Sequence, residues 1–255
     1  MKNYLFIAII TCMTLQTQAQ LKAVAYKDGA QKLNGFAAVP EKKPASGAGI
    51  LILPAWKGID NHSKETAEKL SKLGYTAFIA DIYGEGNYPK DANEAGKQAG
   101  YYKKSFTEYQ KRIALALDQL ILAGANKDKI VVIGYCFGGT GALEAARAGM
   151  NVKGVVSFHG GLGKDASRIS KPIAAKVLVC HGADDSYVPA AEVAAFQDEM
   201  RSSGADWQMI YYANSVHAFT EPEAGNDNSK GVAYNEKAAK RSWEHFMVFL
   251  KEVLE

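Results

Sequence analysis

The sequence of 255 residues has little net charge, few cysteines and, after its first twenty residues, no long apolar run. A formal charge of +3, from 30 basic and 27 acidic side chains, excludes the basic surface typical of proteins that bind nucleic acid or an anionic membrane. No later segment approaches the roughly 18 consecutive apolar residues of a membrane-spanning helix. Repeats, low-complexity segments and linkers are also missing, so residues 20–255, part of a chain that is 47% hydrophobic, are predicted to form one domain.

The first nineteen residues have the layout of a secretory signal peptide. Lys2 supplies a positive charge, residues 5–15 an apolar segment, and residues 17–19 a small-x-small cleavage pattern ending at Ala19. We therefore expect a secreted or periplasmic protein with no membrane association after cleavage. Lipidation at Cys12 and an uncleaved anchor are the alternatives, and the bulky residue before Cys12 disfavours the first.

The rest of the chain alternates short apolar segments with helical patterns, which predicts an α/β fold with a mainly parallel, doubly wound sheet flanked by helices. The predicted strands are 48–53, 75–80, 129–134, 152–158, 176–180 and 207–212, and the predicted helices are 61–73, 106–122, 140–148, 190–202 and 235–253. Residues 33–39 are predicted to add an antiparallel edge strand, and the polar segment 84–104 a loop with at most one short helix.

The strongest chemical signal is Cys136, which stands between Gly134 and Gly138 where the strand 129–134 meets a helix. This G-x-nucleophile-x-G pattern is typical of a sharp strand-to-helix turn in which small residues on either side prevent a clash. The helix dipole at that position favours a thiolate over a thiol. A small buried residue at a tight turn is the structural alternative for Cys136.

A thiol nucleophile needs a base, and the base needs an acid that orients it. The strand 176–180 is followed by Asp184 and Asp185, and the strand 207–212 is followed by His217. In an open parallel sheet, reactive groups gather at the carboxyl ends of strands. Cysteine, carboxylate and histidine thus follow three strand ends in the chain order of the α/β-hydrolases.

These segments resemble the dienelactone hydrolase family of the α/β-hydrolase superfamily. The similar segments are GYCFGG at 134–139, HGADDSYVP at 181–189, VHAF at 216–219 and ADIY at 80–83. The resemblance implies an α/β-hydrolase fold, a triad of Cys136, His217 and Asp185, no metal or organic cofactor, and a small-molecule ester or lactone as substrate. It selects Asp185 over Asp184 by its spacing to the following Val-Pro.

The oxyanion of an acyl-transfer reaction needs backbone N–H donors. We expect one from Phe137, directly after the nucleophile. The segment 54–58 resembles the family's corresponding turn, and we assign the second donor to Trp56, with Ala55 as the adjacent alternative.

Three residues depart from the family pattern and are assigned to the substrate pocket. Ala55 replaces a glutamate, while Glu85 and Glu221 replace two arginines that hold the substrate carboxylate in the family. The resemblance, corrected for these changes, predicts a neutral or cationic ester rather than the anionic dienelactone. Tyr83 and His159 complete the predicted pocket, with His159 more in keeping with structural support.

Two other classes of function stay open. One is a non-catalytic binding module on a hydrolase scaffold, and the other is a thiol redox protein that pairs Cys136 with Cys180. The second predicts a disulfide, whereas the apolar run before Cys180 favours an inert buried thiol. Histidine and cysteine do not cluster at metal-ligand spacing, so no metal is expected.

Overall fold

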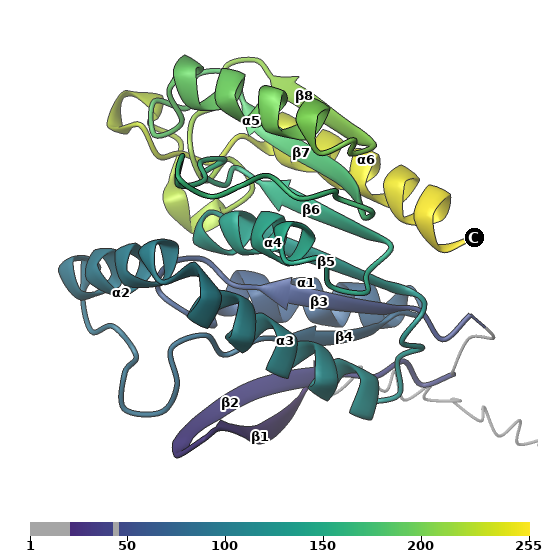
Figure 1. The fold of residues 1–255 in the computed structure, drawn as a ribbon. Coiled ribbons are helices and arrows are strands. Elements are labelled where there is room, and N and C mark those ends of the chain that lie inside the picture. Colours follow the sequence, from purple (N-terminus) through teal and green to yellow (C-terminus); the bar gives the residue numbers. More distant parts are fainter. Residues whose placement is uncertain (1–20, 43–45) are drawn as a thin grey trace, which may run out of the picture.

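The computed structural model describes residues 21–42 and 46–255, which form one eight-stranded sheet with helices on both faces (Figure 1). The predicted leader lies outside these residues. The strands, in chain order, are β1 (Lys22–Asp28), β2 (Gln31–Ala38), β3 (Gly49–Leu53), β4 (Thr76–Ile79), β5 (Ile130–Tyr135), β6 (Gly154–Phe158), β7 (Lys176–Gly182) and β8 (Trp207–Tyr212). Their order across the sheet is β1-β2-β4-β3-β5-β6-β7-β8. The strands β3 to β8 run parallel, as predicted.

Two hydrophobic clusters lie on opposite faces of this sheet and fix which helices cover each face. The helices are α1 (Asn61–Lys72), α2 (Ala92–Lys104), α3 (Phe106–Leu122), α4 (Phe137–Arg147), α5 (Ala190–Ser202) and α6 (Glu236–Leu254). Alternate strand residues pack with α1 and α6 on one face and with α2, α3, α4 and α5 on the other. Because β3 to β7 are covered on both faces, their residues are almost all buried, and this explains their continuous apolar sequences.

Two elements differ from the prediction. The segment 33–39 was expected at the edge of the sheet, but β2 lies inside it, because β1 pairs with β2 as a hairpin and takes the edge. Four residues of β1 are exposed, and its short apolar stretch 23–26 shows no alternation of apolar and polar residues that would mark a half-buried strand. The second difference is α2, a helix of 13 residues in a segment predicted to be mainly loop. Asp91 caps this helix by accepting the N–H of Glu94.

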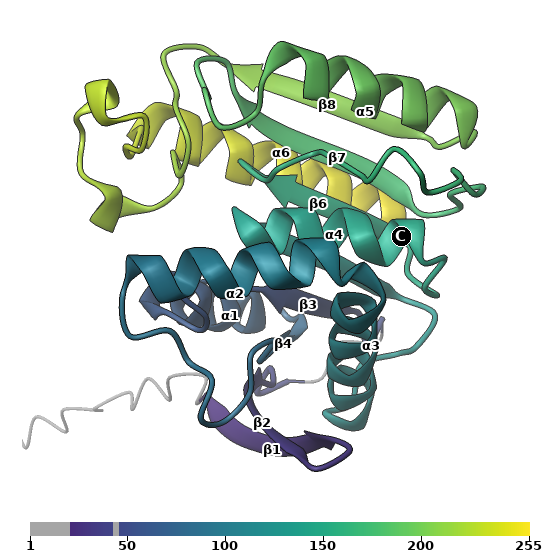
Figure 2. The same cartoon turned by 60° about the vertical axis from the view of Figure 1, so that its left-hand side comes forward.

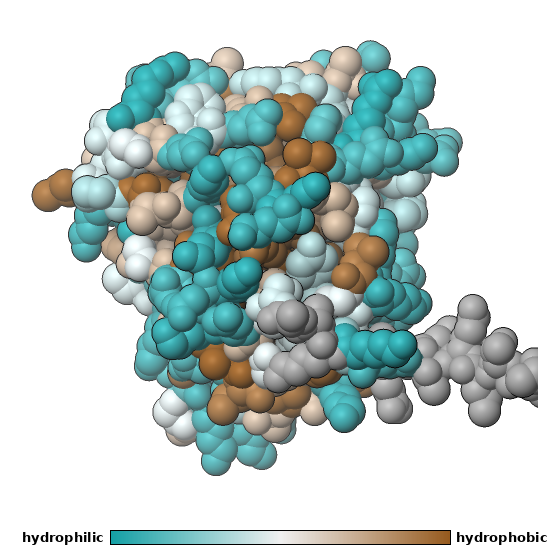
Figure 3. All heavy atoms as spheres, turned by 90° about the vertical axis from the view of Figure 1, so that its right-hand side faces the viewer, coloured by the Kyte–Doolittle hydropathy of each residue, from teal (hydrophilic) through white to brown (hydrophobic). Residues whose placement is uncertain are grey.

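The register aligns the carboxyl ends of the central parallel strands. Tyr135 of β5 pairs with Phe158 of β6, which pairs with Cys180 of β7, and Gly182 pairs with Tyr212 of β8. The segments that follow these strands therefore meet at one edge of the sheet, on the left in Figure 1, and α2 runs across this edge region in Figure 2. The opposite edge is covered largely by hydrophilic residues, with hydrophobic ones in separate patches (Figure 3).

Candidate active site

Cys136 stands at a strained turn between β5 and α4. Its backbone has φ 52° and ψ −114°, in a region that L-residues rarely adopt. The flanking glycines make the turn possible, since a Cβ at Gly134 would lie 1.9 Å from the Gly138 carbonyl oxygen and one at Gly138 would lie 2.0 Å from that of Leu53. The N–H of Cys136 donates to the carbonyl of Phe158 at 3.0 Å, which anchors the turn to β6.

Asp185 lies in the turn that follows β7 and is buried, at 5% exposure. Its backbone N–H donates to the Gly182 carbonyl, and its Oδ1 accepts the N–H of Tyr187 at 2.9 Å. These bonds leave Oδ2 directed at His217. The neighbouring Asp184 is exposed.

His217 lies in the loop after β8, where both of its backbone groups are held by the segment 231–233. Its Nδ1 is 2.9 Å from Oδ2 of Asp185, and its Nε2 is 3.0 Å from Sγ of Cys136. Burial opposes a charge on this imidazole, but the hydrogen bonds to Asp185 and Cys136 outweigh burial and raise the pKa of His217 to about 10. The imidazolium therefore holds a positive charge within hydrogen-bond reach of the Cys136 sulfur.

The two residues predicted to supply the oxyanion donors line the same cavity as Cys136. Phe137 is the first residue of α4, so its N–H has no acceptor within the helix. The N–H of Trp56 donates to no protein acceptor among the described residues, whereas its carbonyl accepts the Tyr83 hydroxyl at 2.6 Å. Phe137 and Trp56 both line the cavity that contains Cys136, and Ala55 does not.

This cavity has a volume of about 380 Å³, and both Cys136 and His217 line it. Its wall includes Tyr187, Val188, Ala218 and Val232 and, from α2, Gly96, Ala99, Gly100 and Lys103. From the sequence, no residue of α2 was assigned to the pocket. The small residues Gly96, Ala99 and Gly100, spaced as one helical face, were the signal that a helix packs closely here.

Of the five predicted pocket residues, Glu221 alone lines the cavity. Ala55 and Tyr83 are buried outside the lining, where the ring of Tyr83 stacks on Phe137. Glu85 was wrongly assigned to the pocket: it lies on the surface, where its carboxylate is 3.9 Å from Lys32. The physical reason is the hairpin of β1 and β2, since the N–H of Glu85 donates to the Lys32 carbonyl and draws this loop towards β2.

His159 does not line the cavity, but packs against the ring of His217 in the interior of the protein. It is fully buried, has φ 39°, and its Nε2 lies 2.7 Å from the Thr220 hydroxyl. Burial lowers the pKa of His159 well below the usual histidine value, so the ring is neutral. Its centroid is 5.4 Å from that of His217, edge to face.

The two described cysteines are free and have different surroundings. Cys180 is completely buried in the cluster on the α1 and α6 face, where burial raises the pKa of its thiol to about 12. Cys136 packs against the cluster on the other face. Pairing them in a disulfide would require the two sulfurs to meet across the sheet.

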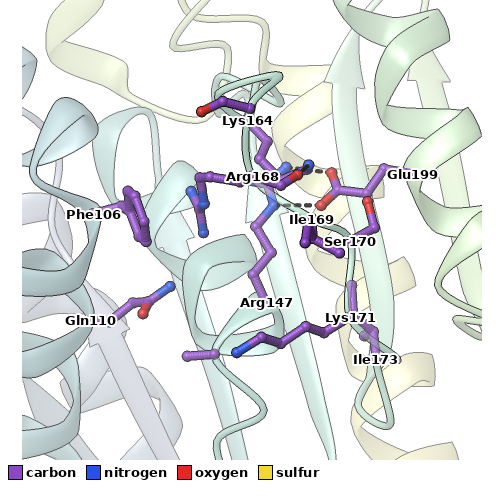
Figure 4. Close-up of a pocket in the computed structure, with 12 residues that line it drawn as sticks. Phe106, Gln110, Arg147, Lys164, Arg168, Ile169, Ser170, Lys171, Ile173 and Glu199 are labelled. Carbon is purple, nitrogen blue, oxygen red and sulfur yellow. Dashed lines mark hydrogen bonds and ion pairs between the residues drawn. The ribbon is translucent and has the colours of Figure 1, made fainter.

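A separate cavity of about 420 Å³ lies between α3, α4, α5 and the segment 163–173 (Figure 4). Its charged groups form a buried network in which Arg147 donates to Glu144 and Glu199, and Arg168 makes two bonds to Glu144. Arg147 also donates to the carbonyls of Leu162 and Gly163. This network fixes the segment after β6 to α4 and α5.

Within residues 21–42 and 46–255, no group of three or more histidine, cysteine, aspartate or glutamate side chains is arranged to hold a metal ion. The same part of the chain contains no helix with the length and hydropathy needed to cross a membrane.

The fold is that of the α/β-hydrolase superfamily, and the contacts from Asp185 through His217 to Cys136 lie at the carboxyl edge of its sheet. The chain belongs to the dienelactone hydrolase family, whose model matches residues 33–254, and is a carboxylic ester or lactone hydrolase. It is 26% identical over 212 residues, 79% of this chain and 82% of the relative, to a Bradyrhizobium sp protein described as "Probable 2-oxo-3-(5-oxofuran-2-ylidene)propanoate lactonase". An uncharacterised Caenorhabditis elegans protein is 35% identical over 129 residues, 50% of this chain and 82% of the relative.

The fold also superposes on solved structures. The crystal structure of a dienelactone hydrolase-like promiscuous phosphotriesterase from metagenomic libraries has a TM-score of 0.86 and 35% identity, and covers 92% of this chain and 98% of that one. A Klebsiella pneumoniae protein with a TM-score of 0.74 and 18% identity covers 91% of this chain and 98% of its own, and shares the fold.

Proposed function

We propose that the protein is a secreted hydrolase that cleaves a carboxylic ester or lactone through a thioester acyl-enzyme. Cys136 is the nucleophile, His217 holds and returns the proton, and Asp185 orients the imidazole. The observation that carries the proposal is the chain of two contacts at His217, 3.0 Å to the sulfur and 2.9 Å to the carboxylate. A nucleophile, a base and an orienting acid in hydrogen-bond reach are the minimum set for covalent acyl transfer.

In the first half of the reaction, the Cys136 thiolate attacks the carbonyl carbon and the negative charge moves to the carbonyl oxygen. The N–H groups of Phe137 and Trp56 stabilise this oxyanion. As the tetrahedral intermediate collapses, the His217 imidazolium gives its proton to the leaving alkoxide, and the thioester remains on the sulfur. Asp185 keeps Nδ1 protonated and lowers the free energy of the imidazolium.

In the second half, neutral His217 takes a proton from water while the hydroxide adds to the thioester carbonyl. Collapse expels the thiolate of Cys136, which restores the ion pair with His217, and releases the carboxylic acid. The cavity of about 380 Å³ suits a small-molecule substrate.

The substrate is a neutral or cationic ester or lactone rather than the anionic dienelactone. The support for this comes from Glu221, a carboxyl group in the lining of the cavity. Glu85 lies away from the cavity and has no part in this preference. Secretion rests on the leader sequence alone, and N-terminal sequencing of the exported protein should start at Gln20 if cleavage follows Ala19.

The test is hydrolysis of short-chain p-nitrophenyl esters combined with intact-mass analysis under turnover. We expect an acylated enzyme whose added mass maps to the peptide with Cys136, and no acylation in Cys136→Ala. Absence of turnover in fresh reductant would favour the binding-module alternative. The redox alternative predicts a disulfide in the native protein, whereas free thiols at both Cys136 and Cys180 would contradict it.

A further inference from the structure

Glu221 is a carboxyl group in the substrate cavity for which the residues that the structure describes supply no hydrogen-bond donor. It lies four residues after His217 and lines the same cavity as Cys136. Its Oε1 is buried and has no hydrogen-bond partner among the described residues. Buried carboxylate oxygens are almost always bonded, because an unsatisfied one loses its hydration without replacement.

The charged groups near Glu221 in the described part of the chain form no hydrogen bond or ion pair with its carboxyl group. Two carboxylates, Asp60 and Glu223, act on it from the loop after β3 and from the short helix η1 (Pro222–Ala224), while Lys57 and His217 oppose them. His217 is already bonded to Asp185 and Cys136.

Lys103, the remaining cation of the cavity lining, forms no ion pair with Glu221. A Cβ built on Gly161 would lie 3.5 Å from Nζ of Lys103 and 3.7 Å from Oε1 of Glu192, so the side chain of Lys103 ends near Gly161. Glu221 forms no ion pair in the described part of the chain.

We propose that Glu221 is a specificity-determining residue, and that it binds a protonated amine carried by the ester substrate. An ammonium group supplies both the missing hydrogen-bond donor and the missing positive charge. This inference rests on the proposed function, because it names the class of ester that the same site takes.

The pKa of Glu221 gives a pH signature for this preference. Burial and the charge of Asp60 raise it to about 7. The carboxyl is therefore neutral in acid and charged above neutrality, so the preference for a cationic ester increases as the pH rises through about 7, over the range in which the substrate amine stays protonated.

The experiment compares two esters of the same shape, 2-(dimethylamino)ethyl acetate and 3-methylbutyl acetate, in which a protonated nitrogen replaces a carbon. Hydrolysis of each ester is measured at pH 8 from the release of acetate, and the ratio of the two kcat/KM values gives the preference. We expect wild type to favour the cationic ester by about tenfold or more, the factor that a charge-assisted hydrogen bond provides. Glu221→Gln should bring the ratio of the two kcat/KM values close to one.

Glu223→Gln is the matched control, because this exposed carboxylate lies two residues away outside the cavity lining. It should retain the preference. Equal rates on the two esters in wild type, or a preference unchanged in Glu221→Gln, would overturn the role of Glu221. The proposed function would still stand in that case if hydrolysis depends on Cys136.

A second readout does not need turnover. The two product alcohols, N,N-dimethylethanolamine and 3-methylbutan-1-ol, are compared for their ability to slow iodoacetamide alkylation of Cys136. Stronger protection by the amine in wild type, lost in Glu221→Gln, supports the inference even if neither ester is cleaved, and equal protection rejects it. Failure of hydrolysis with retained protection would count against the proposed function alone.

Discussion

Nε2 of His217 lies 3.0 Å from Sγ of Cys136, although 81 positions separate the two residues in the chain. The contact exists because β5 and β8 end at the same edge of the sheet and the loop after β8 turns back over the nucleophile. An imidazolium in this position holds a proton within reach of the sulfur before substrate arrives. Most of the predictions below follow from this pair and its supports.

Replacing the nucleophile should abolish catalysis while the fold remains. Cys136→Ser keeps the size of the side chain but replaces the thiolate by a poorly ionised hydroxyl, and we expect kcat to fall by about 10³-fold or more. Ester hydrolysis measured with Cys180→Ser as control tests this, since Cys180 is buried on the other face of the sheet. Full activity of Cys136→Ser would contradict the nucleophile assignment.

The orienting carboxylate can be tested against its sequence neighbour. Asp185→Asn removes the charge that holds Nδ1 of His217 and should lower kcat on the order of 10²- to 10⁴-fold. Asp184→Asn alters an exposed carboxylate and should leave kcat within about twofold of wild type. Equal losses of kcat in both variants would contradict the assignment of Asp185, rather than Asp184, as the orienting carboxylate.

The pH dependence of thiol reactivity follows from His217. Its folded pKa of about 10 lies above the ordinary 6.5, so the imidazolium, and the stability that its ion pair contributes, is fully present below 6.5 and is lost as the pH rises through about 10. Iodoacetamide should therefore alkylate Cys136 at neutral pH much faster than a free thiol, whose pKa is about 8.5. In Asp185→Asn the rate should rise with pH as for an ordinary thiol. A wild-type profile with its midpoint near 8.5 would remove the ion pair from the mechanism.

The turn at the nucleophile should tolerate no side chain at Gly138. A Cβ there would lie 2.0 Å from the Leu53 carbonyl oxygen, a backbone atom that cannot move alone, so Gly138→Ala should lower the free energy of unfolding by about 3 kcal/mol or more. Urea denaturation measures this. Gly100→Ala is the control, since a Cβ on that residue of α2 meets nothing within 4 Å and should stabilise the helix by up to about 1 kcal/mol.

The buried network around Arg147 should stabilise the fold only while all of its charged partners are present. Glu199→Gln leaves Arg147 without one of its two carboxylate partners and should cost about 3 kcal/mol of stability. Asp198→Asn removes an exposed partner of Arg201 and should change stability by less than about 1 kcal/mol. A fall in melting temperature of similar size in both variants would show that the buried ion pair contributes no more stability than the exposed one.

Most of the parallel part of the sheet could be predicted from the sequence, because strands covered on both faces must be apolar throughout. The helices α3 and α5 and the strand β8 have the predicted bounds. The hairpin strand β1 and the helix α2 could not be predicted in this way. Exposed edge residues of β1 carry no hydrophobic period, and α2 is polar, rich in glycine and alanine, and stabilised by its cap and by packing over the cavity.

The sequence by itself determined which reactive groups the chain carries and in which order. They are a cysteine at a turn that glycines permit, followed by a carboxylate and a histidine after later strands. Local chain geometry decides these features, so they can be derived from neighbouring residues. Only the tertiary structure decided which groups share a cavity. It brought α2 and Glu221 to the nucleophile and moved Glu85 to the surface, because the pairing of β1 with β2 and the packing of helices across the sheet depend on contacts between distant parts of the chain.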